Sequence, residues 1–384
     1  REAQPISRAR QLHAGKQTGS LKSVVNFLVK VNRTAMVSIN LPTPVKQALQ
    51  STVIVLVLAF AVQMARLSVI PGARQRRKRL AYLFANFGKP PKNLPPIPAV
   101  EELSKRVIRV LGQNPGSFTL QGTNTYLVGT GEFRVLIDTG DGNLAYHRLL
   151  KSTLREQEAT LSDIIITHEH QDHVGGISRL RLAFPDVRIW KRPKWAGEKD
   201  PSGRKYDCVL ENGTVIAVSG ATLRAVLTPG HTVDHVALVL QEEGAIFTGD
   251  CVLGSGTAVF ENLHDYVGSL RILQRELELS KAECELLAQE VAQELAENDQ
   301  DIADSLSQIV DDEVEIGRLY PGHGALVQNG LQRIKDYIEH RQLREDQIVK
   351  VLQENKKPLS SDELVETIYA DQNLSWILKR GAKR

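Results

Sequence analysis

Residues 166–173 read ITHEHQDH and crowd three histidines, a glutamate and an aspartate behind a β-branched run. The candidate ligands are His168, His170, Asp172 and His173. Neutral imidazole and carboxylate are the ligand types that suit zinc. Side chains two positions apart point in different directions, so these four groups cannot all reach one ion. The spacing therefore predicts a metal site that other parts of the chain complete.

Three further ligand types each follow a glycine, which permits the tight turn that brings a side chain over a strand end. They are His231 in TPGHT, Asp250 in FTGD and His323 in YPGHG. Seven candidates are too many for one tetrahedral ion and suit two ions that share a carboxylate. We predict that the chain holds two Zn²⁺ ions.

Two residues close to these ligands have other expected roles. His235 in GHTVDH is expected to support a ligand by donating a hydrogen bond to it, with plain core packing as the alternative. Cys251 directly follows Asp250, so its side chain should face away from the site if the strand continues, and we assign it to the core.

The elements that must position these residues are short β-branched runs. They are NTYLVG, FRVLIDTG, DIIITHEH, ATLRAVLTPGH, GAIFTGD and GRLYPGH, with helix-like stretches between some of them. Strands interspersed with helices predict an α/β domain. Nearly every run ends in a histidine or an aspartate, so the strand ends are expected to form the platform of one common site.

Charge divides the 384 residues sharply. Residues 1–100 carry sixteen Lys or Arg and one acid, which leaves 48−16=32 basic and 45−1=44 acidic residues beyond them. The part that holds the candidate site is therefore net acidic, which weakens any reading in which it grips a polyanion. Three scattered cysteines do not suggest a disulfide framework.

We predict three regions. Residues 1–96 are a basic extension that ends in the Pro-rich linker GKPPKNLPPIP, and its apolar stretch within 53–70 is a candidate membrane segment. Residues 97–340 form the α/β domain, interrupted by an acidic helical insertion at 275–318. Residues 341–384 should form a helix, a turn around Pro358 and a second helix with Ser361 as N-cap.

The string HEHQDH with the later ligands resembles the metallo-β-lactamase superfamily. This resemblance implies a four-layer αββα sandwich with a dinuclear zinc site along one edge. It assigns His168, His170 and His231 to one zinc and Asp172, His173 and His323 to the second, with Asp250 bridging and Asp138 of LIDTG as a supporting residue. True β-lactamases often carry a cysteine at the position of Asp250, so antibiotic hydrolysis is not expected.

The longer strings SKRVIRVLGQNPGSFTLQGTNTYLVGTG, TPGHTVDHVALVLQEEGAIFTGDCVLG and YIEHRQLREDQI resemble the β-lactamase-like protein 2 group. Its members are mitochondrial endoribonucleases that act on single-stranded RNA and end in a small winged-helix-like domain, here expected in partial form at 341–384. The resemblance also places Asn124 near the substrate, with a plain turn role as the alternative. Together with the Arg-rich N-terminal region it predicts the mitochondrial matrix, against a membrane-anchored or cytoplasmic location.

The expected mechanism is hydrolysis of single-stranded RNA by a water that two zinc ions make acidic enough to be hydroxide near pH 7. Asp172 and Asp250 are the predicted catalytic residues. The alternative is thioester hydrolysis, as in glyoxalase II enzymes and fungal acyl-carrier thioesterases, which share TLQGTNTY-like strings. A binding protein on a decayed enzyme fold is a third reading, and the intact ligand set argues against it. The sequence predicts no oligomeric state.

Overall fold

The structure is a computed structural model that describes residues 90–91, 93–296, 317–355 and 357–370. The chain divides into two compact units, 1–80 and 81–384. All described residues belong to the second unit. The predicted basic extension lies outside them except for residues 90–91 and 93–96, and its candidate membrane segment within 53–70 lies wholly outside them. None of the helices in the described ranges is long and apolar enough to cross a membrane.

A seven-stranded sheet opens the described chain, and its strands neighbour one another in the order of the sequence. Strands β1 to β4 pair antiparallel, whereas β4 to β7 pair parallel. The strands are β1 (Val100–Ser104), β2 (Val107–Leu111), β3 (Asn124–Val128), β4 (Phe133–Ile137), β5 (Thr160–Ile165), β6 (Arg188–Lys191) and β7 (Cys208–Val209).

A five-stranded sheet in the order β12-β11-β10-β9-β8 packs against the first. Strands β11 and β12 pair parallel, so their carboxyl ends lie at the same edge of the sheet. The strands are β8 (Val215–Val218), β9 (Ala221–Leu227), β10 (Val236–Leu240), β11 (Ala245–Gly249) and β12 (Leu319–Pro321), with a short 3₁₀ turn at Gln241–Glu243.

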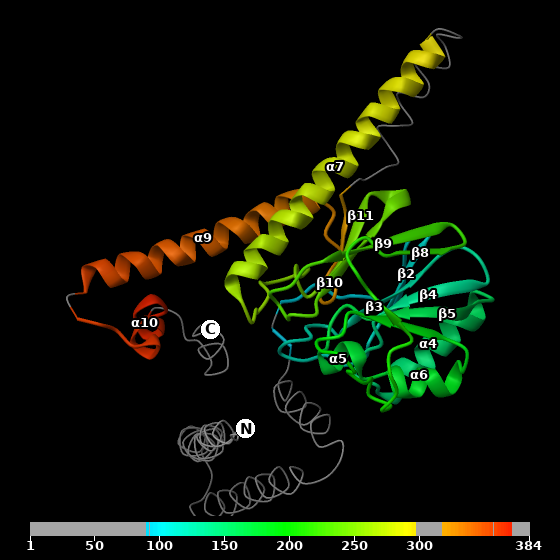
Figure 1. The fold of residues 1–384 in the computed structure, drawn as a ribbon, viewed down its shortest axis with the longest axis horizontal. Coiled ribbons are helices and arrows are strands. Elements are labelled where there is room, and N and C mark those ends of the chain that lie inside the picture. The colour runs from blue at the N-terminus through cyan, green and yellow to red at the C-terminus, as the bar shows by residue number, and fades with distance from the viewer. Residues whose placement is uncertain (1–89, 92, 297–316, 356, 371–384) are drawn as a thin grey trace, which may run out of the picture. The chain divides into compact units, whose positions relative to one another are not determined.

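Three buried clusters show that the fold has four layers. Tyr126 and Phe247 belong to the cluster between the two sheets, where their rings meet edge to face at 5.1 Å. Leu127 faces the opposite way and joins the cluster under α4 (Leu144–Glu156) and α6 (Ile177–Ala183). On the outer face of the second sheet a third cluster lies under α7 (Leu263–Ala296) and α9 (Gly330–Glu354). Figure 1 shows these helix pairs on opposite sides of the sheets, as the predicted αββα sandwich requires.

Alternation along the strands explains why both faces of each sheet are buried. Neighbouring residues of a strand point to opposite faces. In β10, Leu238 therefore enters the cluster between the sheets while Val239 enters the cluster under α7 and α9. Strands buried on both faces read as continuous apolar runs, which is the pattern of VALVL in β10.

The acidic stretch begins inside a helix rather than at a separate element. Helix α7 starts at Leu263, and its first turns place Tyr266, Leu270 and Leu277 in the core. The predicted boundary at 275 falls in the middle of this 34-residue helix, which runs on past the sheets (Figure 1). The remainder of the predicted insertion, residues 297–316, lies outside the described residues.

At the C-terminal side, the predicted boundary at 340 also falls inside one helix, because α9 runs unbroken from Gly330 to Glu354. After a turn, α10 (Ser361–Ile368) follows as predicted, but its N-cap is Ser360 and not Ser361. Ser360 stands three residues before Glu363, which is the spacing of a capping box, and both bonds of that box are present. Two helices and no strand follow Pro321 in the described residues, so the winged-helix-like domain stays a prediction.

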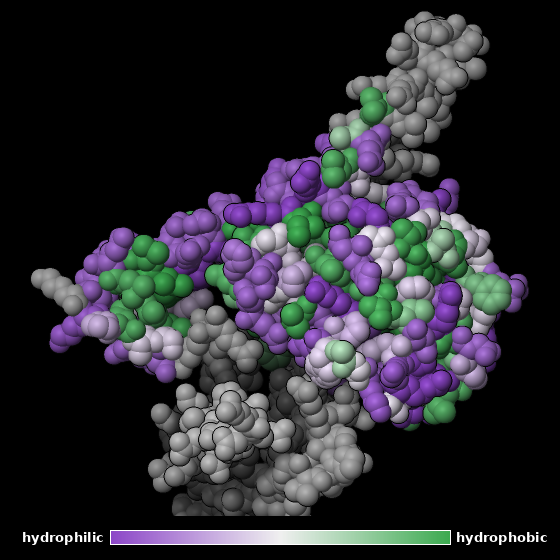
Figure 2. Space-filling view, viewed as in Figure 1, coloured by the Kyte–Doolittle hydropathy of each residue, from purple (hydrophilic) through white to green (hydrophobic). Residues whose placement is uncertain are grey.

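Apolar side chains gather on the outer part of α9 and α10, as Figure 2 shows, and Leu343, Val349 and Leu352 are exposed there.

Closer to the sheets, Arg341 connects α9 to the rest of the domain. The Arg341 guanidinium donates to the Ala258 carbonyl at 2.8 Å and lies over the rings of Phe260 and Tyr266. Helix α9 therefore supports the 258–260 loop.

Gly230 is a glycine that the fold requires, because it forms the turn before His231. Its φ is +130°, and a Cβ there would lie 2.4 Å from the backbone nitrogen and Cα of Tyr266. Its carbonyl also accepts from the backbone N–H groups of Glu261 and Asn262, just before α7 begins. The start of α7 and the His231 turn are thus locked together through glycine.

We expect Gly230→Ala to destabilise the protein and to displace His231. A residue with a Cβ held in such a sparsely populated backbone conformation costs about 1–3 kcal/mol, and overlap with Tyr266 adds to that cost. Gly213→Ala is the matched control, because Gly213 has φ +83° and nothing within 4 Å of its added Cβ. Urea unfolding should show a clearly larger loss for Gly230→Ala, and equal losses would contradict the role of the Tyr266 contact.

Candidate metal centre

The seven predicted ligands meet at one edge of the sandwich although four separate segments of the chain carry them. The loop after β5 and the short helix α5 (Gln171–Val174) carry four of them, the turn after β9 carries His231, and the ends of β11 and β12 carry Asp250 and His323. Their ligand atoms form two groups, each with all atoms within 4.8 Å of one another. We call His168, His170, His231 and Asp250 group one, and Asp172, His173 and His323 group two.

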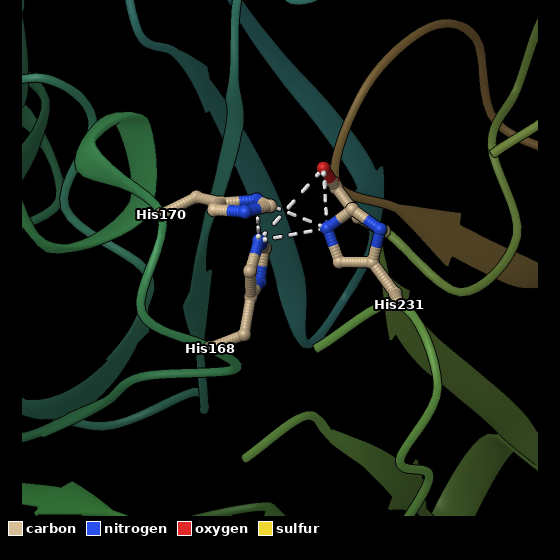
Figure 3. Close-up of side chains that lie close together, drawn as sticks. His168, His170 and His231 are labelled. Carbon is tan, nitrogen blue, oxygen red and sulfur yellow. Dashed lines mark hydrogen bonds and ion pairs between the residues drawn. The ribbon is translucent and has the colours of Figure 1, made fainter. Parts of the chain in front are cut away.

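Group one brings three imidazole rings together through one nitrogen each, as Figure 3 shows. His170 Nδ1 lies 3.0 Å from His168 Nε2 and 3.0 Å from His231 Nε2. The remaining pair, His231 Nε2 and His168 Nε2, is 3.3 Å apart. One proton can satisfy only one of these three contacts, so lone pairs must face one another unless a cation lies among them.

These separations fit a transition metal. Zinc–nitrogen bonds of about 2.0–2.1 Å in a tetrahedron place ligand nitrogens about 3.3 Å apart. The donor set, imidazole nitrogens with a carboxylate, is also the set that zinc and similar divalent ions prefer. Group one therefore fits a metal ion on both spacing and chemistry.

Group two is built from two imidazoles and a carboxylate. Asp172 Oδ2 lies 3.1 Å from His323 Nε2 and 3.3 Å from His173 Nε2, and the two Nε2 atoms are 3.4 Å apart. All three side chains are buried. The same spacing argument applies, so group two also fits a divalent ion.

Asp250 reaches both groups with one carboxylate. Its Oδ2 lies 3.6 Å from His231 Nε2 in group one and 3.4 Å from His323 Nε2 in group two, and its Oδ1 lies 3.5 Å from His173 Nε2. No hydrogen-bond donor reaches the buried Oδ1. A buried carboxylate oxygen without a donor is costly unless a cation satisfies it. The position matches a carboxylate shared by two ions, as the sequence predicted.

The nitrogens that turn away from the groups have their own partners, which fix the ring orientations. His231 Nδ1 donates to the Val259 carbonyl at 2.5 Å. His168 Nδ1 lies 3.0 Å from Thr167 Oγ1, and that hydroxyl contacts Asp138 Oδ2 at 2.9 Å. Asp138 Oδ2 also accepts from His173 Nδ1 at 2.7 Å. Asp138 thus supports His168 through Thr167 and His173 directly, so it reaches both groups.

His235 acts on Asp250 from behind. Its Nε2 accepts the backbone N–H of Asp250 at 3.1 Å, and its Nδ1 lies 2.8 Å from Thr228 Oγ1. The ring is fully buried, and burial, followed by the charges of neighbouring groups, holds its pKa well below the usual value. The predicted supporting role agrees with this geometry, although His235 accepts the hydrogen bond instead of donating it. Cys251 is fully buried in the core, as predicted.

Asn124, predicted to lie near the substrate, is 1% exposed. Its amide nitrogen donates to the carbonyls of Pro321 and Gly324, each at 2.8 Å, on either side of His323. Both amide hydrogens are therefore used to hold the His323 turn, and neither is left for a substrate.

Burial lowers the pKa of the histidines in both groups, and the nearby carboxylates outweigh it at His323 in group two. Burial, reinforced by His231, lowers the pKa of His170 to about 4, and burial holds the pKa of His168 well below its usual value. In group two, burial opposes protonation of His323, but the carboxylates of Asp250 and Asp172 outweigh it and raise the pKa to about 9. Without metal at neutral pH, the imidazoles of His168 and His170 are neutral, whereas His323 carries a proton.

We expect Asp250→Asn to weaken metal binding at both groups, because a neutral amide bridges two cations poorly. The loss should exceed the roughly 10–100-fold that removal of an outer hydrogen bond costs. Metal analysis after dialysis gives the measurement, and His170→Ala is the comparison, since it should empty group one alone. If Asp250→Asn lost only one metal ion, Asp250 would be a ligand of that ion alone and would not be shared by two.

The pKa difference predicts that the two groups empty at different pH values. Metal binding requires neutral histidine, so binding at group two releases a proton below about pH 9, and each unit of pH below that costs about tenfold in affinity per proton. In group one, the pKa of His170 is about 4 and that of His168 is well below its usual value, so protons compete with a metal ion for these two rings only at much lower pH. As the pH is lowered from 9 to 5, the metal content should fall from about two ions per chain towards one. Simultaneous loss of both ions would contradict the assignment.

Residues 118–290 match the metallo-beta-lactamase superfamily. The chain is 39% identical over 284 residues to a beta-lactamase-like protein 2 homolog from Caenorhabditis elegans, which covers 74% of this chain and 82% of that protein. It is also 39% identical over 277 residues to an atrochrysone carboxyl ACP thioesterase from Aspergillus fumigatus, covering 71% of this chain and 73% of that enzyme.

A solved structure shares the fold. A beta-lactamase domain protein from Burkholderia ambifaria superposes with a TM-score of 0.55 at 18% identity and covers 75% of this chain and 86% of that one. Three findings indicate the same family. They are the two sheets in four layers, the two adjacent His/Asp groups at one edge, and the match to relatives over most of their length. This chain belongs to the metallo-β-lactamase superfamily and carries the paired metal-binding groups of its hydrolases.

Proposed function

We propose that the protein is an endoribonuclease that cleaves single-stranded RNA. The observation that carries the proposal is the carboxylate of Asp250, which spans both metal-binding groups at 3.4–3.6 Å. Two metal ions held by these groups would suit in-line displacement at phosphorus, because the charge of a phosphodiester is spread over several oxygens. Similarity to the Caenorhabditis elegans beta-lactamase-like protein 2 homolog over 82% of its length supports the same reading.

When bound, the metals would supply Lewis acidity and lower the pKa of water. The chain itself supplies the geometry. Asp138 and Thr167 hold the rings of His173 and His168, and His235 holds the backbone of Asp250. Asp172 stays ionised, because the nearby imidazoles of His173 and His323 outweigh its burial and keep its pKa low. An ionised carboxylate beside the reacting atoms can accept the proton that water loses, which is the role proposed for Asp172.

In the C-terminal helical part of the chain, a few basic side chains are candidates for RNA contacts. Arg341 is engaged with the Ala258 carbonyl and two rings, and Arg344 lies over the ring of Tyr369 at 4.4 Å. Lys350 is 75% exposed and pairs only loosely with Glu354 at 4.0 Å. Lys350 and the exposed Lys357 are therefore the better candidates for phosphate contacts. Their small number agrees with the net acidic character of residues 101–384 and predicts weak, salt-sensitive binding.

Thioester hydrolysis is the second candidate, and a specific observation favours it. Two apolar residues flank His231 and are open to solvent, with Val233 51% and Val259 40% exposed. An apolar rim suits an acyl chain better than a phosphate backbone. The Aspergillus fumigatus ACP thioesterase is as similar in identity as the beta-lactamase-like protein 2 homolog.

We expect the metal-loaded protein to cleave labelled single-stranded RNA and to leave an acyl thioester intact when both are assayed side by side. Asp172→Ala and His173→Ala should lower the cleavage rate by at least about 100-fold, as loss of a group at the reacting atoms does, while RNA binding persists. Lys350→Glu should instead raise KM. If RNA stays uncut across a range of salt while the thioester is hydrolysed and chelator stops that reaction, the thioesterase reading replaces the nuclease.

A further inference from the structure

A hydroxyl that the sequence did not single out contacts a group-two ligand. Thr123 Oγ1 lies 3.3 Å from Asp172 Oδ2, the oxygen that faces both His173 and His323. Thr123 is fully buried. It directly precedes β3, and its backbone forms an isolated bridge with His323. One residue therefore touches two of the three members of group two.

Asn114 determines where the Thr123 proton points. Asn114 Oδ1 accepts from the Thr123 backbone N–H at 2.9 Å, and that N–H can only donate. The amide oxygen is thereby identified, so the Asn114 amide nitrogen is the atom 3.0 Å from Thr123 Oγ1, and it donates to that hydroxyl. With one lone pair so occupied, the hydroxyl proton is free to be donated to Asp172.

The neighbouring Asn124 completes the arrangement. Its two amide donations to Pro321 and Gly324 bracket His323, as described above. Thr123 and Asn124 thus hold Asp172 and the His323 turn from adjacent positions. Group one has different supports, since His168 relies on Thr167 and His231 on the Val259 carbonyl.

We propose that Asn114 and Thr123 form a positioning pair that sets the metal affinity of group two and leaves that of group one unchanged. The Thr123 hydroxyl fixes the rotation of the Asp172 carboxylate, so that Oδ2 is aimed between the two imidazoles. Asn114 fixes the direction of that hydroxyl. This inference rests on the metal-binding groups and not on the identity of the substrate.

Thr123→Val removes the hydroxyl and keeps the shape of the side chain. The affinity of group two should fall by about tenfold or more, within the roughly 10–100-fold range for hydrogen bonds that orient a ligand. Thr123→Ser keeps the hydroxyl and should restore most of the affinity. Chelator competition in a His170→Ala background, where group one is disabled, isolates the metal held by group two.

Thr125→Val is the matched control. Thr125 lies two positions further along, in β3, and is equally buried, but its hydroxyl donates to the Val110 carbonyl at 2.7 Å and accepts from Tyr146. Thr125→Val removes an equally buried hydroxyl, but that hydroxyl makes no hydrogen bond to a metal ligand. Metal affinity should be unchanged in this variant, even if its unfolding midpoint falls as far as that of Thr123→Val.

Asn114→Asp tests the direction of the proton separately. A carboxylate would accept from the Thr123 hydroxyl, so the hydroxyl would turn away from Asp172 and group two should weaken although Thr123 is intact. The group-two affinity of Asn114→Asp is measured by the same chelator competition. Its group-one affinity is measured in an Asp172→Ala background, where group two is disabled. Equal losses at both groups, or a Thr123→Val affinity equal to that of Thr125→Val, would overturn the proposal whatever substrate the enzyme cleaves.

Discussion

The convergence of imidazole lone pairs and carboxylates at one buried edge is the constraint on which the rest of the structure depends. Three nitrogens within 3.0–3.3 Å of one another cannot all be satisfied by protons, and a carboxylate oxygen of Asp250 has no donor. Such a cluster is stable only when cations occupy it or when the surrounding fold holds it in place. The fold does hold it, through outer partners such as Asp138, Thr167 and His235.

The two sheets meet that constraint by bringing strand ends together from distant parts of the chain. Parallel pairing of β4 with β5 and of β11 with β12 delivers Asp138, His168, Asp250 and His323 to the same edge. Side chains buried on both faces make the strand ends rigid. Ligands fixed in this way need little reorganisation when an ion arrives, which is the benefit of building a site on strands instead of on long loops.

Much of the site could be predicted because its signals are local. A histidine or aspartate that follows Gly at the end of an apolar run can be recognised in the sequence, and counting these ligands predicts two ions. The division of the ligands into two groups came from the family resemblance. The supports could not be found in this way. Thr123 and Asp172 are 49 residues apart, and their contact exists only once β3 and the loop after β5 share an edge. For the same reason Asn124 looked like a turn or a substrate contact, although its amide clamps a loop nearly 200 positions away. The sequence did not reveal that α7 continues across residue 275, because the composition becomes acidic partway along the helix. A change of composition marks no helix end when neither a capping residue nor a helix breaker is present.

The electrical asymmetry of the groups bears on how the site could act. In group one the imidazoles of His168 and His170 are neutral and need release no proton to accept an ion, whereas group two pairs imidazolium with carboxylate until an ion displaces the protons. The two groups share Asp250, so an ion at either one withdraws charge from that carboxylate and lowers the electrostatic support for protonated His323. Filling group one therefore makes group two easier to deprotonate but leaves it with a weaker shared ligand. The orientation of Asp172, the carboxylate that belongs to group two alone, becomes the means by which the fold keeps that second affinity high.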